Sequence, residues 1–79
     1  MEPFLVEFRR SRVDKLAYLS HEGEEFIYLI NGTLEFRTKK ETLILNAGDS
    51  LYFDSSIPHA YRSLERKNSK ALVVVYSKR

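Results

Sequence analysis

The chain contains no cysteine among its 79 residues. This absence excludes disulfide bridges and thiolate zinc sites, and it predicts a reducing compartment, the cytoplasm. No apolar run approaches the ~20 residues that a membrane-spanning helix requires, and the N-terminus lacks the layout of a signal peptide. Glycine-rich phosphate loops and G-x-S-x-G nucleophile motifs are also missing. We therefore predict no membrane association and no P-loop or serine-hydrolase chemistry.

The length allows one domain, over residues 1–79, and leaves no room for a second. Such a short chain buries only about 60% of the surface that its unfolded form exposes. A hydrophobic content of 43% suits a packed core, and a partner subunit would extend that core. We therefore expect a homodimer. The net charge of +2 comes from small, scattered basic groups, which are typical of solvated loops rather than of a nucleic-acid surface.

Short alternating apolar stretches, separated by turn residues, run through the whole sequence, and no window has helical periodicity. This pattern predicts an all-β fold, a small antiparallel β-barrel or sandwich. We expect its strands at residues 3–8, 16–21, 25–30, 33–38, 42–45, 50–53, 59–63 and 70–77.

Two features of the expected strands bear on the packing. Asn31-Gly32 is typical of a type I′ turn and predicts a hairpin between its neighbouring strands. In the strand that follows, alternation places Phe36 inward and Glu35 outward. The strands 25–30 and 70–77 carry apolar residues on both faces, so we expect both of their faces to be covered.

Two histidines and one glutamate are the candidates for metal chemistry. His21 and Glu25 have the same strand parity, and His59 joins them only if the fold brings it close. Two imidazoles and one carboxylate suit a divalent first-row metal and leave coordination positions open. The alternative is that both histidines are ordinary polar residues at strand ends, hydrogen-bonded to Glu25. Tyr61 shares the face of His59, and Phe53 is expected to form an apolar wall beside it.

The motifs around these residues resemble the conserved-barrel cupin family. His21 is followed after three residues by Glu25 and after six more by Gly32, while Gly48 begins a second motif that ends at His59. This resemblance covers residues 16–63 and implies a jelly-roll barrel with His21, Glu25 and His59 as metal ligands. The sequence is also similar to the C-terminal cupin sensor domain of bacterial helix-turn-helix regulators. That similarity implies a small-molecule effector, with DNA contacted only through a helix-turn-helix domain that this chain does not contain.

One position departs from the family pattern. The first metal-binding histidine of the family falls on Leu19, so three of four ligands remain. The departure implies that zinc, iron, manganese or nickel is bound weakly or not at all, in a pocket made more apolar by Leu19. We predict a non-catalytic, ligand-sensing domain with Leu19, Phe53 and Tyr61 as ligand-binding residues. The alternatives are a metal-dependent dioxygenase or isomerase and a barrel with a purely structural role.

Overall fold

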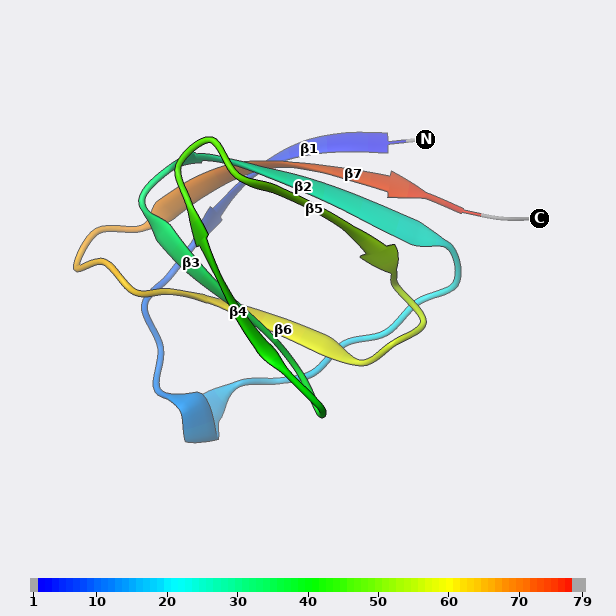
Figure 1. Cartoon of the computed structure of the whole chain (residues 1–79), viewed down its shortest axis with the longest axis horizontal. Helices are drawn as coiled ribbons and strands as arrows, with labels where there is room; N and C mark the ends of the chain where they lie inside the picture. The colour runs from blue at the N-terminus through cyan, green and yellow to red at the C-terminus, as the bar shows by residue number, and fades with distance from the viewer. Residues whose placement is uncertain (1, 78–79) are drawn as a thin grey trace.

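Two antiparallel sheets face each other in the computed structural model, which describes residues 2–77. Figure 1 shows them as two layers joined by the segments that precede β3, β5, β6 and β7. The first sheet has the order β1 (Glu2–Phe8), β7 (Ser69–Tyr76), β2 (Glu24–Asn31) and β5 (Ser50–Asp54). The second has the order β4 (Thr42–Asn46), β3 (Thr33–Thr38) and β6 (His59–Ser63). The predicted all-β class with antiparallel sheets is confirmed.

The core lies between the sheets because alternate residues of each strand point toward the other layer. Its fully or nearly fully buried members are Ile27, Leu29, Leu34, Leu45, Ala71 and Val73. Glu25 has the same strand parity as Ile27 and is therefore carried inward with it. The carboxylate of Glu25 therefore lies inside the barrel, because it belongs to the same inward-facing set of residues as the apolar core of β2.

The expected hairpin at Asn31-Gly32 is wrong. β2 pairs with β5 and β7, so both of its edges are occupied, and β3 pairs with β4 and β6 in the other sheet. The dipeptide therefore carries the chain from one sheet to the other. A type I′ turn needs positive φ at both central residues, whereas here only Gly32 has it, at 91°.

The expected strand at residues 16–21 is also wrong. The segment makes one antiparallel bridge, from Leu19 to His59, and a further hydrogen bond from the His21 amide to the Ser55 carbonyl. β6 begins only at His59, so the segment cannot form a ladder with β6 that is longer than one residue pair. Between this bridge and a second bridge at Arg10, a single 3-10 turn, η1 (Val13–Lys15), carries the chain away from the sheet. Within residues 2–77 no helix is long and apolar enough to cross a membrane.

Glu35 was expected to face outward, but the structure buries it, with 6% of its surface exposed. Arg62 donates to both of its carboxylate oxygens, at 2.8 and 3.2 Å, and Arg37 donates a third hydrogen bond at 3.0 Å. Arg62 also donates to the Ser11 carbonyl at 2.8 Å, which fastens the connection after β1 to the second sheet. The hydrogen bonds from Arg62 lower the pKa of Glu35 below its ordinary value, and burial only partly opposes them.

We expect Glu35→Gln to reduce the free energy of unfolding at neutral pH by about 2–4 kcal/mol, because two arginines lose their buried counter-charge. The folded pKa of Glu35 is the lower one, so its contribution is full above a pH of about 4.5 and is lost as the pH falls through that folded value. Urea unfolding at several pH values measures both effects. The exposed control Glu41→Gln should change stability by less than about 0.5 kcal/mol. Equal losses in the two variants would contradict the role of Glu35.

The outer face of the first sheet is uncovered within one chain. Leu5 on β1 is 65% exposed and Tyr52 on β5 is 62% exposed, at opposite edges of this face. Between them lie Tyr28 and Leu72, which face each other across β2 and β7 and are also exposed. Contiguous apolar surface of this kind marks interaction sites in many proteins.

Candidate metal centre

The fold brings His21, Glu25 and His59 to one place in the barrel. Their ligand atoms all lie within 4.8 Å of one another. Nε2 of His21 is 3.1 Å from Oε1 of Glu25, and Nε2 of His59 is 3.6 Å from the same oxygen. Glu25 and His59 are buried, whereas the side chain of His21 remains 39% exposed. One carboxylate oxygen therefore faces two imidazole nitrogens at the mouth of the barrel.

The positions of these side chains follow from the backbone around them. Gly23, with a φ of 110°, bends the chain between His21 and the start of β2, so that both His21 and Glu25 turn toward the interior. Its carbonyl accepts a hydrogen bond from the Ser55 amide. His59 is the first residue of β6, where the bridge to Leu19 fixes its backbone.

The donor set fits a divalent first-row metal. Two ligands that bind one such ion at about 2.1 Å each lie no more than about 4.2 Å apart. The separations of 3.1 and 3.6 Å between Glu25 and the two histidines satisfy this limit. Imidazole nitrogen with carboxylate oxygen is a combination that suits zinc, iron, nickel and cobalt. The chemistry of the three groups and the spacing of Glu25 from each histidine are thus compatible with a bound ion.

A hydrogen bond orients the ring of His59. Nδ1 lies 2.8 Å from the Ile57 carbonyl oxygen, which can only accept, so Nδ1 carries the proton. In the neutral imidazole Nε2 then presents its lone pair to the Glu25 carboxylate. Two electron-rich atoms facing each other in a buried site are unfavourable unless a cation or a proton lies between them. Backbone support of this type commonly sets the tautomer of a metal-ligating histidine.

Tyr61 holds the other oxygen of the carboxylate. Its hydroxyl donates to Oε2 of Glu25 at 2.6 Å. Burial, together with this hydrogen bond, raises the pKa of Tyr61 far above its ordinary value, so the phenol remains protonated and acts as a donor. Oε1 of Glu25 is thereby left to the two histidines. Sequence parity predicted that Tyr61 and His59 share a face, but this hydrogen bond was not predicted.

A cavity of about 320 Å³ opens beside the three ligands. Of the predicted ligand-binding residues, Leu19 and Tyr61 line it, with Leu19 at the rim and 66% exposed. Phe53 is not among the lining residues. It packs behind the site instead, with its ring 4.8 Å from that of His59. The sequence analysis also missed the wall contributed by β1, where alternation alone places Val6 and Phe8 inward.

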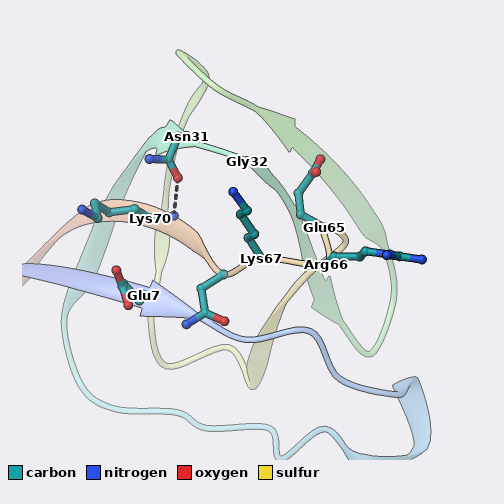
Figure 2. Close-up of a pocket in the computed structure, with 8 residues that line it drawn as sticks. Glu7, Asn31, Gly32, Glu65, Arg66, Lys67 and Lys70 are labelled. Carbon is teal, nitrogen blue, oxygen red and sulfur yellow. Dashed lines mark hydrogen bonds between the residues drawn. The ribbon is translucent and has the colours of Figure 1, made fainter.

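A second hollow, of about 750 Å³, lies at the opposite end of β2 from Glu25, beside the turn at Asn31-Gly32 that connects the two sheets (Figure 2). It is lined by Glu7, Asn31, Gly32, Glu65, Arg66, Lys67, Asn68 and Lys70. Figure 2 shows Arg66 and Lys70 pointing to opposite sides of this hollow. Because its cations diverge and two glutamates lie among them, the hollow lacks a convergent binding group.

Two serines, Ser55 and Ser56, lie in the turn between β5 and β6. Ser56 caps this turn, since its amide and its hydroxyl both donate to Asp54. The hydroxyl of Ser55 is buried and has no hydrogen-bond partner within the described part of the chain, so no base activates it there. The arrangement gives no support to a serine nucleophile.

Comparison with known proteins adds a family and a fold. Residues 5–75 match the family described as the cupin domain. No curated protein matches the chain. Hydroxypropylphosphonic acid epoxidase from S. wedmorenis in complex with fosfomycin superposes with a TM-score of 0.83 at 22% identity, covering 94% of this chain and 42% of that one.

Two metal-bound forms of the same enzyme, HppE, superpose equally well. The Fe(II) form with substrate gives a TM-score of 0.83 at 22% identity, covering 94% of this chain and 44% of that one. The Co(II) form with substrate gives 0.81 at 23% identity, with coverages of 94% and 43%. The chain thus spans less than half the length of these structures, and at such identities the likeness concerns the fold.

Proposed function

This chain belongs to the cupin family, and we propose that it binds a divalent metal together with a small organic molecule in the barrel. His21, Glu25 and His59 would hold the metal, and the adjoining cavity would hold the molecule. The observation that carries this proposal is the orientation of His59, whose Nδ1 is hydrogen-bonded to the Ile57 carbonyl while its Nε2 is turned toward a buried carboxylate 3.6 Å away.

In this proposal the residues around the three ligands orient those ligands and exclude water from the cavity. A metal in this position would act as a Lewis acid toward an oxygen atom of the bound molecule. Tyr61 fixes Glu25, and the Ile57 carbonyl fixes His59, so both ligands are pre-oriented. The apolar side chains of the cavity exclude water and orient the remainder of the molecule.

We assign the domain a sensing role, in which the bound molecule is an effector. The pocket is closed on one side by the segment before β2, which contributes Ala17 and Leu19. Backbone bridges at Arg10 and Leu19 hold this segment to β6. An effector that contacts the closed segment favours that arrangement through differential affinity. Transcriptional control would then require a DNA-binding domain linked to this one.

A metal-dependent enzyme is the second candidate. Three protein ligands leave coordination positions open for a substrate, as catalytic sites require. The fold likeness to HppE, whose structures contain Fe(II) or Co(II), favours this alternative. Turnover of a bound molecule by the metal-loaded protein would separate an enzyme from a sensor, which only binds.

Metal titration of protein purified without added metal tests the proposal, and Leu19→His sharpens it. The substitution adds an imidazole to the cavity lining, at the position where the family has its further ligand. We expect one metal ion per chain in the unaltered protein, and at least about tenfold tighter binding in the variant, since a fourth ligand completes the set. Calorimetry with cobalt(II) or zinc(II) measures both.

The control is Leu64→His, which adds an imidazole at an exposed position outside this cavity. It should leave the affinity unchanged. Absence of stoichiometric metal in both the unaltered protein and Leu19→His would refute the proposal.

We also propose that the chain forms a homodimer through the outer face of the first sheet. The groove on this face is lined by Glu24, Phe26, Tyr52, Val74 and Tyr76. The face is acidic at one end, where Glu24 lies beside Asp54. At the other end Lys70, Arg66 and Lys67 lie near Glu7 and Glu65, so three cations outnumber two acids there. A twofold axis across the strands places the acidic end of one copy over this weakly basic end of a second copy, which favours the pairing of like faces.

Leu72→Glu should convert the dimer to a monomer, because it places a charge at the centre of the apolar face. Sedimentation velocity at several concentrations measures the change. Ile44→Glu is the matched control, since Ile44 is an exposed residue of β4 in the other sheet. A monomeric unaltered protein, or a Leu72→Glu variant that remains dimeric, would refute the assignment of this face.

A further inference from the structure

From the charges and walls of the cavity we propose that its ligand is a small, mainly apolar molecule with one negative charge, and that phosphonates and other dianions are rejected. This inference rests on the proposed metal binding. It goes beyond that proposal because it names the chemical class of the ligand.

The first step is the balance of charge. The residues that line the cavity include one acid, Glu25, and neither lysine nor arginine. A divalent ion held by two neutral imidazoles and one carboxylate has a net charge of +1. One negative charge on the ligand neutralises this site, whereas a second would face the nonpolar side chains that line the cavity and find no cation among them, which is costly.

The two half-buried arginines of the second sheet are already used. Arg37 and Arg62 on the second sheet both donate to the buried Glu35. Releasing either of them would leave that carboxylate uncompensated, so they are not available to a ligand. The net charge of the metal ion and its three protein ligands therefore determines how much negative charge the ligand can carry.

The second step is the apolar character of the walls. Six nonpolar residues line the cavity beside the three ligands and Tyr61: Val6, Phe8, Ala17, Leu19, Ala60 and Val73. The hydroxyl proton of Tyr61 is committed to Glu25. A polar group at the far end of the ligand would thus be buried without a side-chain donor, at a free-energy cost.

The third step is size. A volume of about 320 Å³ is at the lower end of the range of ~300–1,000 Å³ for small-molecule pockets. The cavity accordingly suits a compact molecule, such as a carboxylate attached to one ring or to a short branched chain.

Calorimetry of the cobalt(II)-loaded protein with three probes of matched skeleton tests the inference. The probes are phenylacetate, phenylacetamide and benzylphosphonate, at a pH at which the phosphonate is doubly ionised. Phenylacetate should bind at least about tenfold more tightly than either of the others, and only to the metal-loaded protein. Perturbation of the cobalt absorption bands gives a second readout of the same binding.

Leu19→Arg provides a gain-of-function test, because it adds a cation at the rim without removing a metal ligand. It should raise the affinity for benzylphosphonate relative to phenylacetate by about tenfold, through a charge-assisted hydrogen bond. Val13→Arg, at an exposed position outside the cavity, should leave the ratio unchanged.

The outcomes separate the two proposals. Failure to load cobalt would overturn the metal proposal and this inference with it. Stoichiometric cobalt with benzylphosphonate bound as tightly as phenylacetate would overturn the inference alone. Equal binding of phenylacetamide, or binding of phenylacetate to metal-free protein, would also overturn it.

Discussion

His59→Ala should weaken binding of a divalent metal by more than about 100-fold. The substitution removes one of three ligands, and removal of an outer-shell partner alone already costs roughly 10–100-fold. His59 is also the ligand with the most restricted orientation, because its Nδ1 is hydrogen-bonded to the Ile57 carbonyl and its ring is buried. Within residues 2–77 the lining of the cavity holds no further histidine or acid beside these three ligands, so no side chain there can replace it.

Tyr61→Phe is the matched comparison for this result. It preserves the ring packing against Phe8, 4.8 Å away, but removes the hydroxyl that holds Glu25. We expect a loss of about 10–100-fold, the range for an outer-shell partner. The metal affinity of His59→Ala should therefore be lower than that of Tyr61→Phe. Competition titration with a chromogenic chelator measures both, and circular dichroism verifies that each variant is folded.

Metal binding that is unaffected in folded His59→Ala would contradict the ligand assignment. Equal losses in His59→Ala and Tyr61→Phe would indicate that both act through the position of Glu25 rather than as ligand and support. The second result would leave Glu25 and His21 as the primary ligands.

Gly23→Ala should produce the largest loss of stability, about 2–5 kcal/mol. Gly23 has a φ of 110°, which an alanine adopts only with strain of about 1–2 kcal/mol. A Cβ atom there would also lie 2.1 Å from the Tyr76 carbonyl oxygen. Relief of that overlap requires a backbone shift of the kind that costs about 1–3 kcal/mol in overpacked sites. The loss is a large part of the ~4–12 kcal/mol expected for a domain of this size.

Gly48→Ala is the control that isolates the close approach. Its φ of 95° is comparable, but a Cβ atom at this position meets nothing within 4 Å. We expect a loss of only about 1–2 kcal/mol, from strain alone. Chemical unfolding of both variants gives the difference directly. If Gly48→Ala is as destabilised as Gly23→Ala, the contact with Tyr76 is not the cause.

Gly23→Ala should also weaken metal binding in whatever fraction remains folded. The glycine lies between His21 and Glu25, and its bend turns both toward the interior. A shift of the backbone away from Tyr76 would change the separation of these two ligands. The same substitution therefore connects the stability of the first sheet to the geometry of the site.

Local sequence signals predicted most of the strands because alternation and turn residues act over a few neighbouring positions. The strands at 33–38 and 59–63 were predicted with the bounds that the structure gives. The same alternation correctly placed Tyr61 on the face of His59. Leu19, which the family resemblance placed in the pocket, lies at the rim of the cavity.

The predictions of a hairpin at Asn31-Gly32 and of a strand at residues 16–21 were wrong because strand pairing depends on which edges of the neighbouring strands are already occupied. Asn31-Gly32 has the composition of a hairpin turn, but β5 and β7 occupy both edges of β2, so the chain enters the other sheet. Residues 16–21 have an alternating pattern, but the adjoining strand begins at His59 and offers one residue for pairing. Glu35 has outward parity, but Arg37 and Arg62 cover it.

The sequence by itself determined the class of fold, the strand faces and the proximity of His21 to Glu25, because each depends on neighbours along the chain. Only the tertiary structure decided that His59 approaches the same carboxylate oxygen, that Tyr61 holds the other oxygen, and that β1 closes the cavity. These contacts join residues more than 30 positions apart or lying in different sheets. Their geometry is set by the packing of the two sheets, a property that no local pattern contains.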